Sequence, residues 1–154
     1  MENLQLTQRP VAKAEMLIRR PVAEVFEAFI DPAKTSKFWF SRGSGRLEPG
    51  KQVQWDWEMY GFSVQVKVLA IEEQKRILIE WSAFDQPTMV EWIFIVRDEN
   101  ATFVSITNTG FSGNGDEQAK QAIASAEGFA LVLAGLKAFL EQNIILQLVA
   151  DRHP

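Results

Sequence analysis

Cysteine is absent from this sequence of 154 residues, and histidine occurs once, as His153. Without cysteine the chain has no disulfide, no thiol nucleophile and no cysteine ligand for zinc. A single histidine beside the C-terminus argues against a histidine metal cluster and against a Ser-His-Asp triad. Because these absences remove most of the common catalytic residue sets, we expect no catalytic group, no metal and no cofactor.

Neither sign of charge dominates, since 16 Lys and Arg face 20 Asp and Glu, and nucleic acid is therefore not an expected partner. The longest apolar stretch, from Phe129 to Ala150, is interrupted by Lys137 and Glu141. That argues against a membrane span, which needs about 20 apolar residues. The first residues contain neither a basic nor an apolar segment, so we expect no signal peptide and a cytoplasmic protein.

Aromatic residues are plentiful, with 5 Trp and 11 Phe against 1 Tyr, in a chain that is 47% hydrophobic. A chain of this length is expected to form one domain with a buried core. We place that domain at residues 11–150, after a flexible arm at residues 1–10. The function has to account for the excess of tryptophan and phenylalanine.

The first third of the chain predicts a strand from Val11 to Arg19 and then two short helices. Pro21 suits the first position of a helix, and apolar residues follow it at helical spacing. Asp31-Pro32 ends this helix, because the residue before proline avoids the α region, and the same pair can begin a second one. We expect the second helix to end near Phe38 and Trp39.

The middle of the chain alternates between apolar and polar residues, which is typical of antiparallel strands with one buried face. The expected strands are 44–48, 53–59, 62–68, 77–81, 90–96 and 102–108. On this alternation Trp55, Trp57, Met59, Trp81 and Trp92 face inward.

A long helix is expected from Asp116 to Val149, started by a capping box of Asn114 and Glu117. Its expected buried side is made of Phe129, Val132, Leu133, Leu136, Leu140 and Ile144. A meander with one apolar face needs a cover, and only this helix is large enough. The sequence therefore predicts an α+β fold, with a curved antiparallel sheet wrapped around a long C-terminal helix.

Several segments resemble the AHSA1-like (activator of Hsp90 ATPase homologue-like) branch of the START/polyketide cyclase (SRPBCC) superfamily. The matching segments are 21–29, Asp31-Pro32, Phe38-Trp39, 102–111, 127–129 and 136–141. The resemblance covers Ala12 to Gln142, and it implies the helix-grip (START/Bet v1-like) fold with an apolar cavity between the sheet and the long helix. Two positions depart from the family pattern: Phe38 replaces the first of two paired tryptophans, and Asn108 stands where a histidine is common.

The inward tryptophans have two interpretations, because they either line a pocket that stacks on a flat ligand or fill the core. Gly128 and Gly135 lie on one side of the long helix, where they either leave room for a ligand or let another backbone approach. An inward Asn108 amide either contacts a ligand or caps a strand end. The expected cavity residues are Trp39, Trp55, Trp57, Trp81, Trp92, Asn108, Gly128, Val132 and Gly135.

The strand carboxylates give no support for acid–base chemistry. Asp56, Glu80 and Glu91 alternate with inward tryptophans or other apolar residues, and Glu15 lies within the first strand. We expect these four groups to be solvated or to form cross-strand ion pairs.

Three functional hypotheses follow. The first is a non-enzymatic protein that binds a small hydrophobic, aromatic or lipid-like ligand in the cavity. The second, implied by the resemblance alone, is a chaperone-associated stress-response protein that uses an outer surface. The third is a cyclase-like enzyme, which the lack of a usable histidine or cysteine disfavours. The sequence does not fix the oligomeric state.

Overall fold

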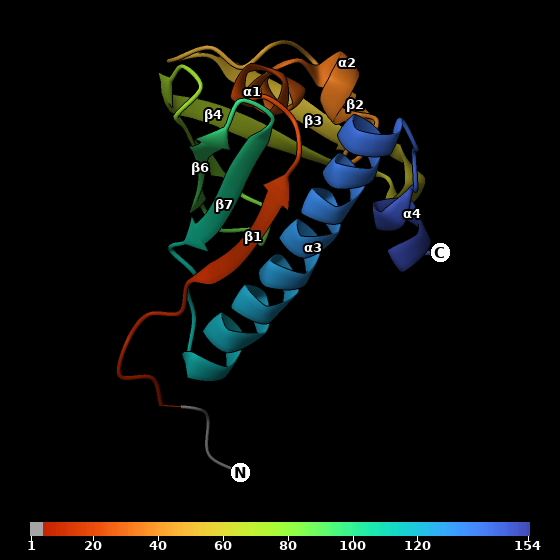
Figure 1. Ribbon diagram of the computed structural model, residues 1–154. Helices are drawn as coiled ribbons and strands as arrows, with labels where there is room; N and C mark the ends of the chain where they lie inside the picture. The colour runs from red at the N-terminus through yellow and green to blue at the C-terminus, as the bar shows by residue number, and fades with distance from the viewer. Residues whose placement is uncertain (1–4) are drawn as a thin grey trace.

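Seven strands form one curved antiparallel sheet in the order β1-β7-β6-β5-β4-β3-β2 (Figure 1). The computed structural model describes residues 5–154. The strands are β1 (Ala12–Ile18), β2 (Arg42–Gly43), β3 (Gln52–Trp57), β4 (Phe62–Glu72), β5 (Arg76–Trp81), β6 (Thr88–Asp98) and β7 (Ala101–Thr109). Neighbours from β2 to β7 pair in chain order, and β1 joins the sheet through β7. The long helix α3 (Gly115–Gln142) accompanies this sheet, so the α+β helix-grip prediction is confirmed.

Strict alternation places the large apolar side chains of the central strands on the inner face. Trp55 and Trp57 are 2% and 4% exposed, and Trp81 and Trp92 are 7% and 1% exposed. Met59 breaks the prediction, because β3 ends at Trp57 and the short 3-10 helix η1 (Glu58–Tyr60) follows. Gly61 closes this turn in the left-handed region at φ 62°, and Met59 is left 42% exposed.

The expected strand at residues 44–48 is also wrong. β2 lies earlier, with Arg42 opposite Asp56 and Gly43 opposite Trp55. The Leu47 amide donates instead to the Ile30 carbonyl at 3.2 Å, and the Leu47 side chain is buried in the core. Since that donor is used outside the sheet, this segment cannot continue as a strand.

Two short helices, α1 (Val22–Ile30) and α2 (Pro32–Thr35), connect β1 to β2. The Asp31 side chain caps α2 by accepting from the Ala33 amide at 3.0 Å, as the Asp-Pro pair predicts. Pro21 is the N-cap of α1 rather than its first residue. α2 ends at Thr35, before Phe38 and Trp39, both of which are buried. Of the predicted flexible arm, residues 1–4 lie outside the described residues, and residues 5–10 form no helix or strand.

α3 begins as predicted, since the Asn114 side chain accepts from the Glu117 amide at 2.9 Å. It ends earlier than predicted, at Gln142, because Asn143 adopts a left-handed conformation with φ 54°. The amides of Asn143 and Ile144 then bond back to carbonyls of the last turn, which ends the helix. Ile144 is consequently 48% exposed rather than buried, and a separate short helix, α4 (Leu148–Arg152), folds back against α3 (Figure 1).

The buried side of α3 packs on the sheet core, and the helix runs alongside β1 (Figure 1). Val132, Leu133 and Leu136 are at most 1% exposed. By length and composition α3 is apolar enough to cross a membrane, but core helices of globular domains pass the same test. About 33% of the apolar window is buried inside the domain, including these three residues, and other apolar residues of the helix, such as Ile123, are exposed.

Candidate functional site

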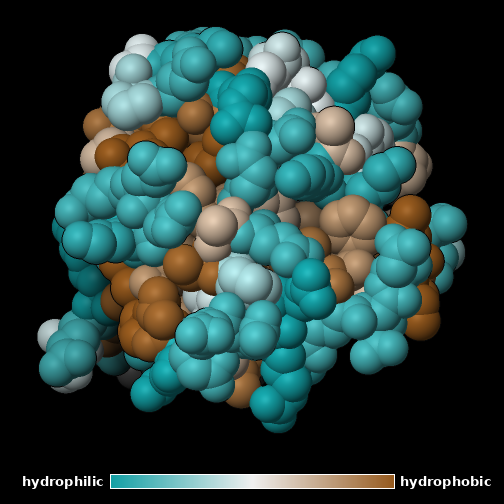
Figure 2. Space-filling model, turned by 45° about the horizontal axis from the view of Figure 1, so that its top comes forward, coloured by the Kyte–Doolittle hydropathy of each residue, from teal (hydrophilic) through white to brown (hydrophobic). Residues whose placement is uncertain are grey.

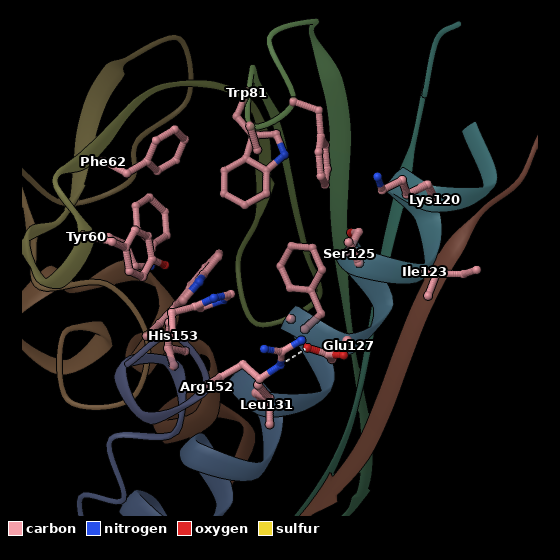
Figure 3. Close-up of a pocket in the computed structure, with 18 of the residues that line it drawn as sticks. Tyr60, Phe62, Trp81, Lys120, Ile123, Ser125, Glu127, Leu131, Arg152 and His153 are labelled. Atoms are coloured by element: carbon pink, nitrogen blue, oxygen red, sulfur yellow. Dashed lines mark hydrogen bonds and ion pairs between the residues drawn. The ribbon is translucent and has the colours of Figure 1, made fainter. Parts of the chain in front are cut away.

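A pocket of about 770 Å³ lies at the end of the sheet where the β3–β4 hairpin, the β5–β6 loop, α3 and α4 meet (Figure 3). This volume falls within the range of about 300–1,000 Å³ that is usual for small-molecule sites. Its walls are formed by Trp39, Trp57, Tyr60, Phe62, Trp81, Ala83, Phe84, Asp116, Ala119, Lys120, Ile123, Ala124, Ser125, Glu127, Gly128, Phe129, Leu131, Val149, Arg152 and His153. Most of these side chains are apolar or aromatic, so the pocket suits an apolar ligand.

The inner wall is a cluster of four rings, which we call the aromatic wall: Trp39, Trp57, Trp81 and Phe129. Trp39 lies 5.6 Å from Phe129 and 5.9 Å from Trp81 between ring centroids. Trp81 lies 5.9 Å from Phe129 at an interplanar angle of 32°. Rings held by one another in this way present a rigid apolar surface on which a flat molecule can stack.

One polar atom of the aromatic wall is both buried and without a hydrogen-bond partner. The indole Nε1 of Trp81 is buried and makes no hydrogen bond. Trp92 Nε1 is in the same state, but Trp92 lies deeper and is not part of the pocket. Figure 3 shows the Trp81 ring extending from the end of β5 into the pocket, with its nitrogen on the edge turned toward Ser125.

The structure brings four of the nine expected cavity residues to the pocket: Trp39, Trp57, Trp81 and Gly128. Trp55, Trp92 and Val132 are instead buried in the core, at most 2% exposed, behind that wall. They do not line the pocket because other aromatic rings cover them. Trp55 packs at 4.9 Å from both Trp39 and Phe40, and Trp92 packs against Phe29.

Gly135 is a packing position and not a cavity position. A Cβ added there would lie 3.2 Å from the Cβ and from the carbonyl oxygen of Phe38. The missing side chain therefore lets α3 approach the segment after α2. At Gly128, by contrast, an added Cβ would meet no atom within 4 Å, so that glycine borders open space.

Both ends of the Asn108 amide make structural hydrogen bonds. Its Nδ2 donates to the Met89 carbonyl at 2.8 Å, and its Oδ1 accepts from Ser125 Oγ at 2.8 Å. The amide is 0% exposed and lies outside the pocket lining. It links β7 to β6 and to α3, so the structure gives no support to a ligand contact at Asn108.

The outer wall was missed by sequence reasoning. Tyr60 and Phe62 come from the β3–β4 hairpin, Arg152 is the last residue of α4, and His153 follows it. Arg152 Nε donates to Glu127 Oε1 at 2.5 Å, and the rings of Tyr60 and His153 lie 5.3 Å apart (Figure 3). Burial raises the pKa of the Tyr60 hydroxyl above its usual value. The signal that could have found α4 is Asn143, a residue type that tolerates the left-handed conformation needed to end α3.

The strand carboxylates face solvent and form cross-strand contacts. Glu91 accepts from Arg76 at 2.6 Å, and Glu80 lies 3.8 Å from Lys67. Hydrogen bonds from Ser63 and Gln54 hold the pKa of Asp56 below its usual value. Within residues 5–154, no group of three or more His, Asp or Glu side chains is placed to hold a metal ion. The pocket walls are mainly a binding surface, because most of their side chains are apolar or aromatic.

Fold and pocket together define a helix-grip domain with an apolar cavity between its sheet and its C-terminal helices. The sequence model of the family described as Activator of Hsp90 ATPase homolog 1-like protein matches residues 19–141. The chain therefore belongs to this family.

Several solved structures share the fold. Protein SSP2350 from Staphylococcus saprophyticus is 28% identical, with a TM-score of 0.77 over 90% of this chain and 96% of that one. DynU16, a protein of the dynemicin biosynthetic locus, is 21% identical, with a TM-score of 0.75 over 88% of this chain and 48% of that one. The Aha1 dimer from Colwellia psychrerythraea is 20% identical, with a TM-score of 0.71 over 86% of this chain and 97% of that one. No curated protein matches the sequence.

Proposed function

We propose that this protein binds a small hydrophobic ligand, aromatic or lipid-like, in the pocket between the end of the sheet, α3 and α4. The observation that carries the proposal is the aromatic wall facing a space of about 770 Å³ beside Gly128. Stacking on rigid rings favours flat apolar molecules, and the absence of a side chain at Gly128 keeps the space open. Binding rather than catalysis is proposed, because the pocket walls are mainly apolar and aromatic.

The proposal is tested by titrating the protein with flat aromatic compounds while following tryptophan fluorescence and backbone amide shifts. Gly128→Leu fills the space beside the aromatic wall, and we expect it to abolish binding while the melting temperature stays close to that of the wild type. Ala130→Leu is the matched control, because Ala130 is exposed on the same helix and lies outside the pocket lining. Binding that survives Gly128→Leu, or no binding at sub-millimolar ligand, would refute the proposal.

The family description names activation of the Hsp90 ATPase, and a chaperone-associated role is the alternative proposal. On the face shown in Figure 2, hydrophobic residues emerge in separate patches between hydrophilic ones. Large apolar residues are also exposed outside the pocket: Val96 lies on β6, and Ile144, Ile145 and Leu146 are consecutive between α3 and α4. We prefer the pocket because it gathers apolar and aromatic side chains from several elements around one space. A chaperone that binds the Gly128→Leu variant and the wild type equally well, with no ligand found, would favour the alternative.

A further inference from the structure

The indole N–H of Trp81, which has no hydrogen-bond partner, indicates which kind of polar group a ligand of this pocket carries. Trp81 is 7% exposed, lies in the aromatic wall and has four ring neighbours: Trp39, Trp55, Trp57 and Phe129. None of these neighbours offers an oxygen acceptor to Nε1. A buried N–H without an acceptor destabilises the protein, because the group has lost its hydrogen bond to water and gained none in return. A ligand that supplies an acceptor removes this penalty and should therefore bind more tightly than one that does not.

Trp92 provides an internal comparison. Its Nε1 also lacks a partner, but its ring is covered by Phe29, Trp39 and Phe129 and does not border the pocket. A ligand in the pocket can therefore reach the wall at Trp81 and not at Trp92. Trp81 Nε1 is itself covered from solvent, so contact with a ligand requires a small displacement of its ring or of the adjoining β5–β6 loop.

The charges around the pocket favour a neutral acceptor. The lining contains two acidic residues, Asp116 and Glu127, and two basic residues, Lys120 and Arg152. Arg152 is already paired with Glu127, and Asp116 lies one turn before Lys120 on α3. The aromatic wall itself carries no charge. An anion buried against it would lose its hydration, since Lys120 and Arg152 lie on α3 and α4 and not in this wall, and a cation has no lone pair to accept from Trp81 Nε1.

We propose that the ligand is a neutral, flat, apolar molecule with an acceptor oxygen of the carbonyl or ether type that accepts from Trp81 Nε1. This inference rests on the proposed function, because it specifies the chemistry of a ligand in the same pocket. The rings of the wall provide affinity for the apolar body, and the indole N–H fixes its orientation. Molecules of the same shape that lack the oxygen should bind more weakly.

The test uses 9-fluorenone and fluorene, which share a shape and differ by a carbonyl in place of a methylene group. Their dissociation constants are measured on the wild type, on Trp81→Phe and on Trp92→Phe. For each protein we take the ratio of the dissociation constants of fluorene and fluorenone. Differences in solubility between the two compounds affect this ratio equally in every variant, so they cancel when variants are compared. We expect Trp81→Phe to reduce the preference for fluorenone by about tenfold, the size of one hydrogen bond, and Trp92→Phe to leave it unchanged.

The indole proton resonance of Trp81, assigned by triple-resonance NMR of the wild type, gives a second measurement that needs no variant. We expect it to move downfield with fluorenone and not with fluorene. If Trp81→Phe does not fold, this shift alone decides, with the Trp92 resonance as the control.

The outcomes separate the two proposals. Equal preference for the two compounds in all variants, or no difference in the indole shift, overturns the acceptor inference while the pocket stands. Tighter binding of fluorene-9-carboxylate than of fluorenone would refute the inference that the ligand is neutral. No binding of either compound to the wild type refutes this inference together with the proposed function.

Discussion

Gly128 and Gly135 lie about two turns apart on nearly one side of α3, but only Gly128 faces open space. At Gly135 the added Cβ would meet Phe38, whose backbone carbonyl cannot move without disturbing the turn after α2. The same residue type therefore serves two purposes on one helix, access to a pocket and close packing.

This difference predicts opposite effects of one substitution. Gly128→Ala should stabilise the protein by about 0.5–1 kcal/mol, since alanine favours a helix more than glycine and meets no neighbour. Gly135→Ala should destabilise it by about 1 kcal/mol, because overpacking against Phe38 exceeds the same helical gain. Chemical denaturation of both variants measures the two changes. A Gly135→Ala variant as stable as the wild type would show that Phe38 can give way.

The hydrogen bond from Ser125 to Asn108 predicts a coupled loss of stability. Ser125→Ala leaves the buried Asn108 Oδ1 without a donor and should cost about 1–3 kcal/mol. Combining it with Asn108→Ala should cost less than the sum of the two single changes, because the partners share one interaction. Denaturant unfolding of the wild type, the two single variants and the double variant gives the coupling free energy between Ser125 and Asn108. The exposed Ser112→Ala serves as control and should change stability little.

Glu141 fastens the end of α3 to the end of β1 and predicts a pH dependence. Its carboxylate accepts from the Arg19 amide at 2.8 Å and from Lys137 Nζ at 2.7 Å. Burial acts to raise its pKa, but these two donors outweigh burial and hold the pKa below the ordinary value of 4.5. A pKa lowered by folding stabilises the folded state above the unfolded-state pKa, and that stabilisation is lost as the pH falls through the folded-state value.

Glu141→Gln should therefore lower stability by about 1–2 kcal/mol at pH 7, the size of a hydrogen bond to a charged group. The difference from the wild type should narrow as the pH falls below 4.5. Thermal unfolding across this pH range, beside the exposed Glu73→Gln, checks the prediction. A difference that does not depend on pH would rule out the carboxylate charge as its source.

The ion pair between Arg152 and Glu127 is predicted to affect ligand exchange more than stability. Both side chains are about half exposed, at 53% and 50%, so Arg152→Ala should change the free energy of unfolding by less than about 1 kcal/mol. Because the pair holds α4 against α3 beside the pocket, its loss should speed ligand dissociation. Stopped-flow measurement of dissociation tests this. Arg46→Ala, which removes an ion pair with Glu27 elsewhere, is the control and should leave the rate unchanged.

Local patterns determined most of the architecture. Alternation of period two fixes which side of a strand is buried, and it placed Trp55, Trp57, Trp81 and Trp92 inward without reference to any distant residue. The caps at Asp31 and Asn114 likewise depend on neighbours within three residues along the chain. The order of these signals was enough to predict a curved antiparallel sheet covered by a long helix, and the family resemblance implied that this is the helix-grip fold.

The tertiary structure decided which inward residues border the pocket. Trp55 and Trp81 are equivalent by alternation, but one is covered by Phe40 and the other borders the pocket, because residues distant in sequence pack against one and not the other. The turn at Asn143 sends α4 back over α3 and brings Arg152 to Glu127, a contact across 25 residues. Periodicity reports burial along one element, whereas a pocket is the space left where several elements fail to meet, and that depends on how their side chains pack in three dimensions.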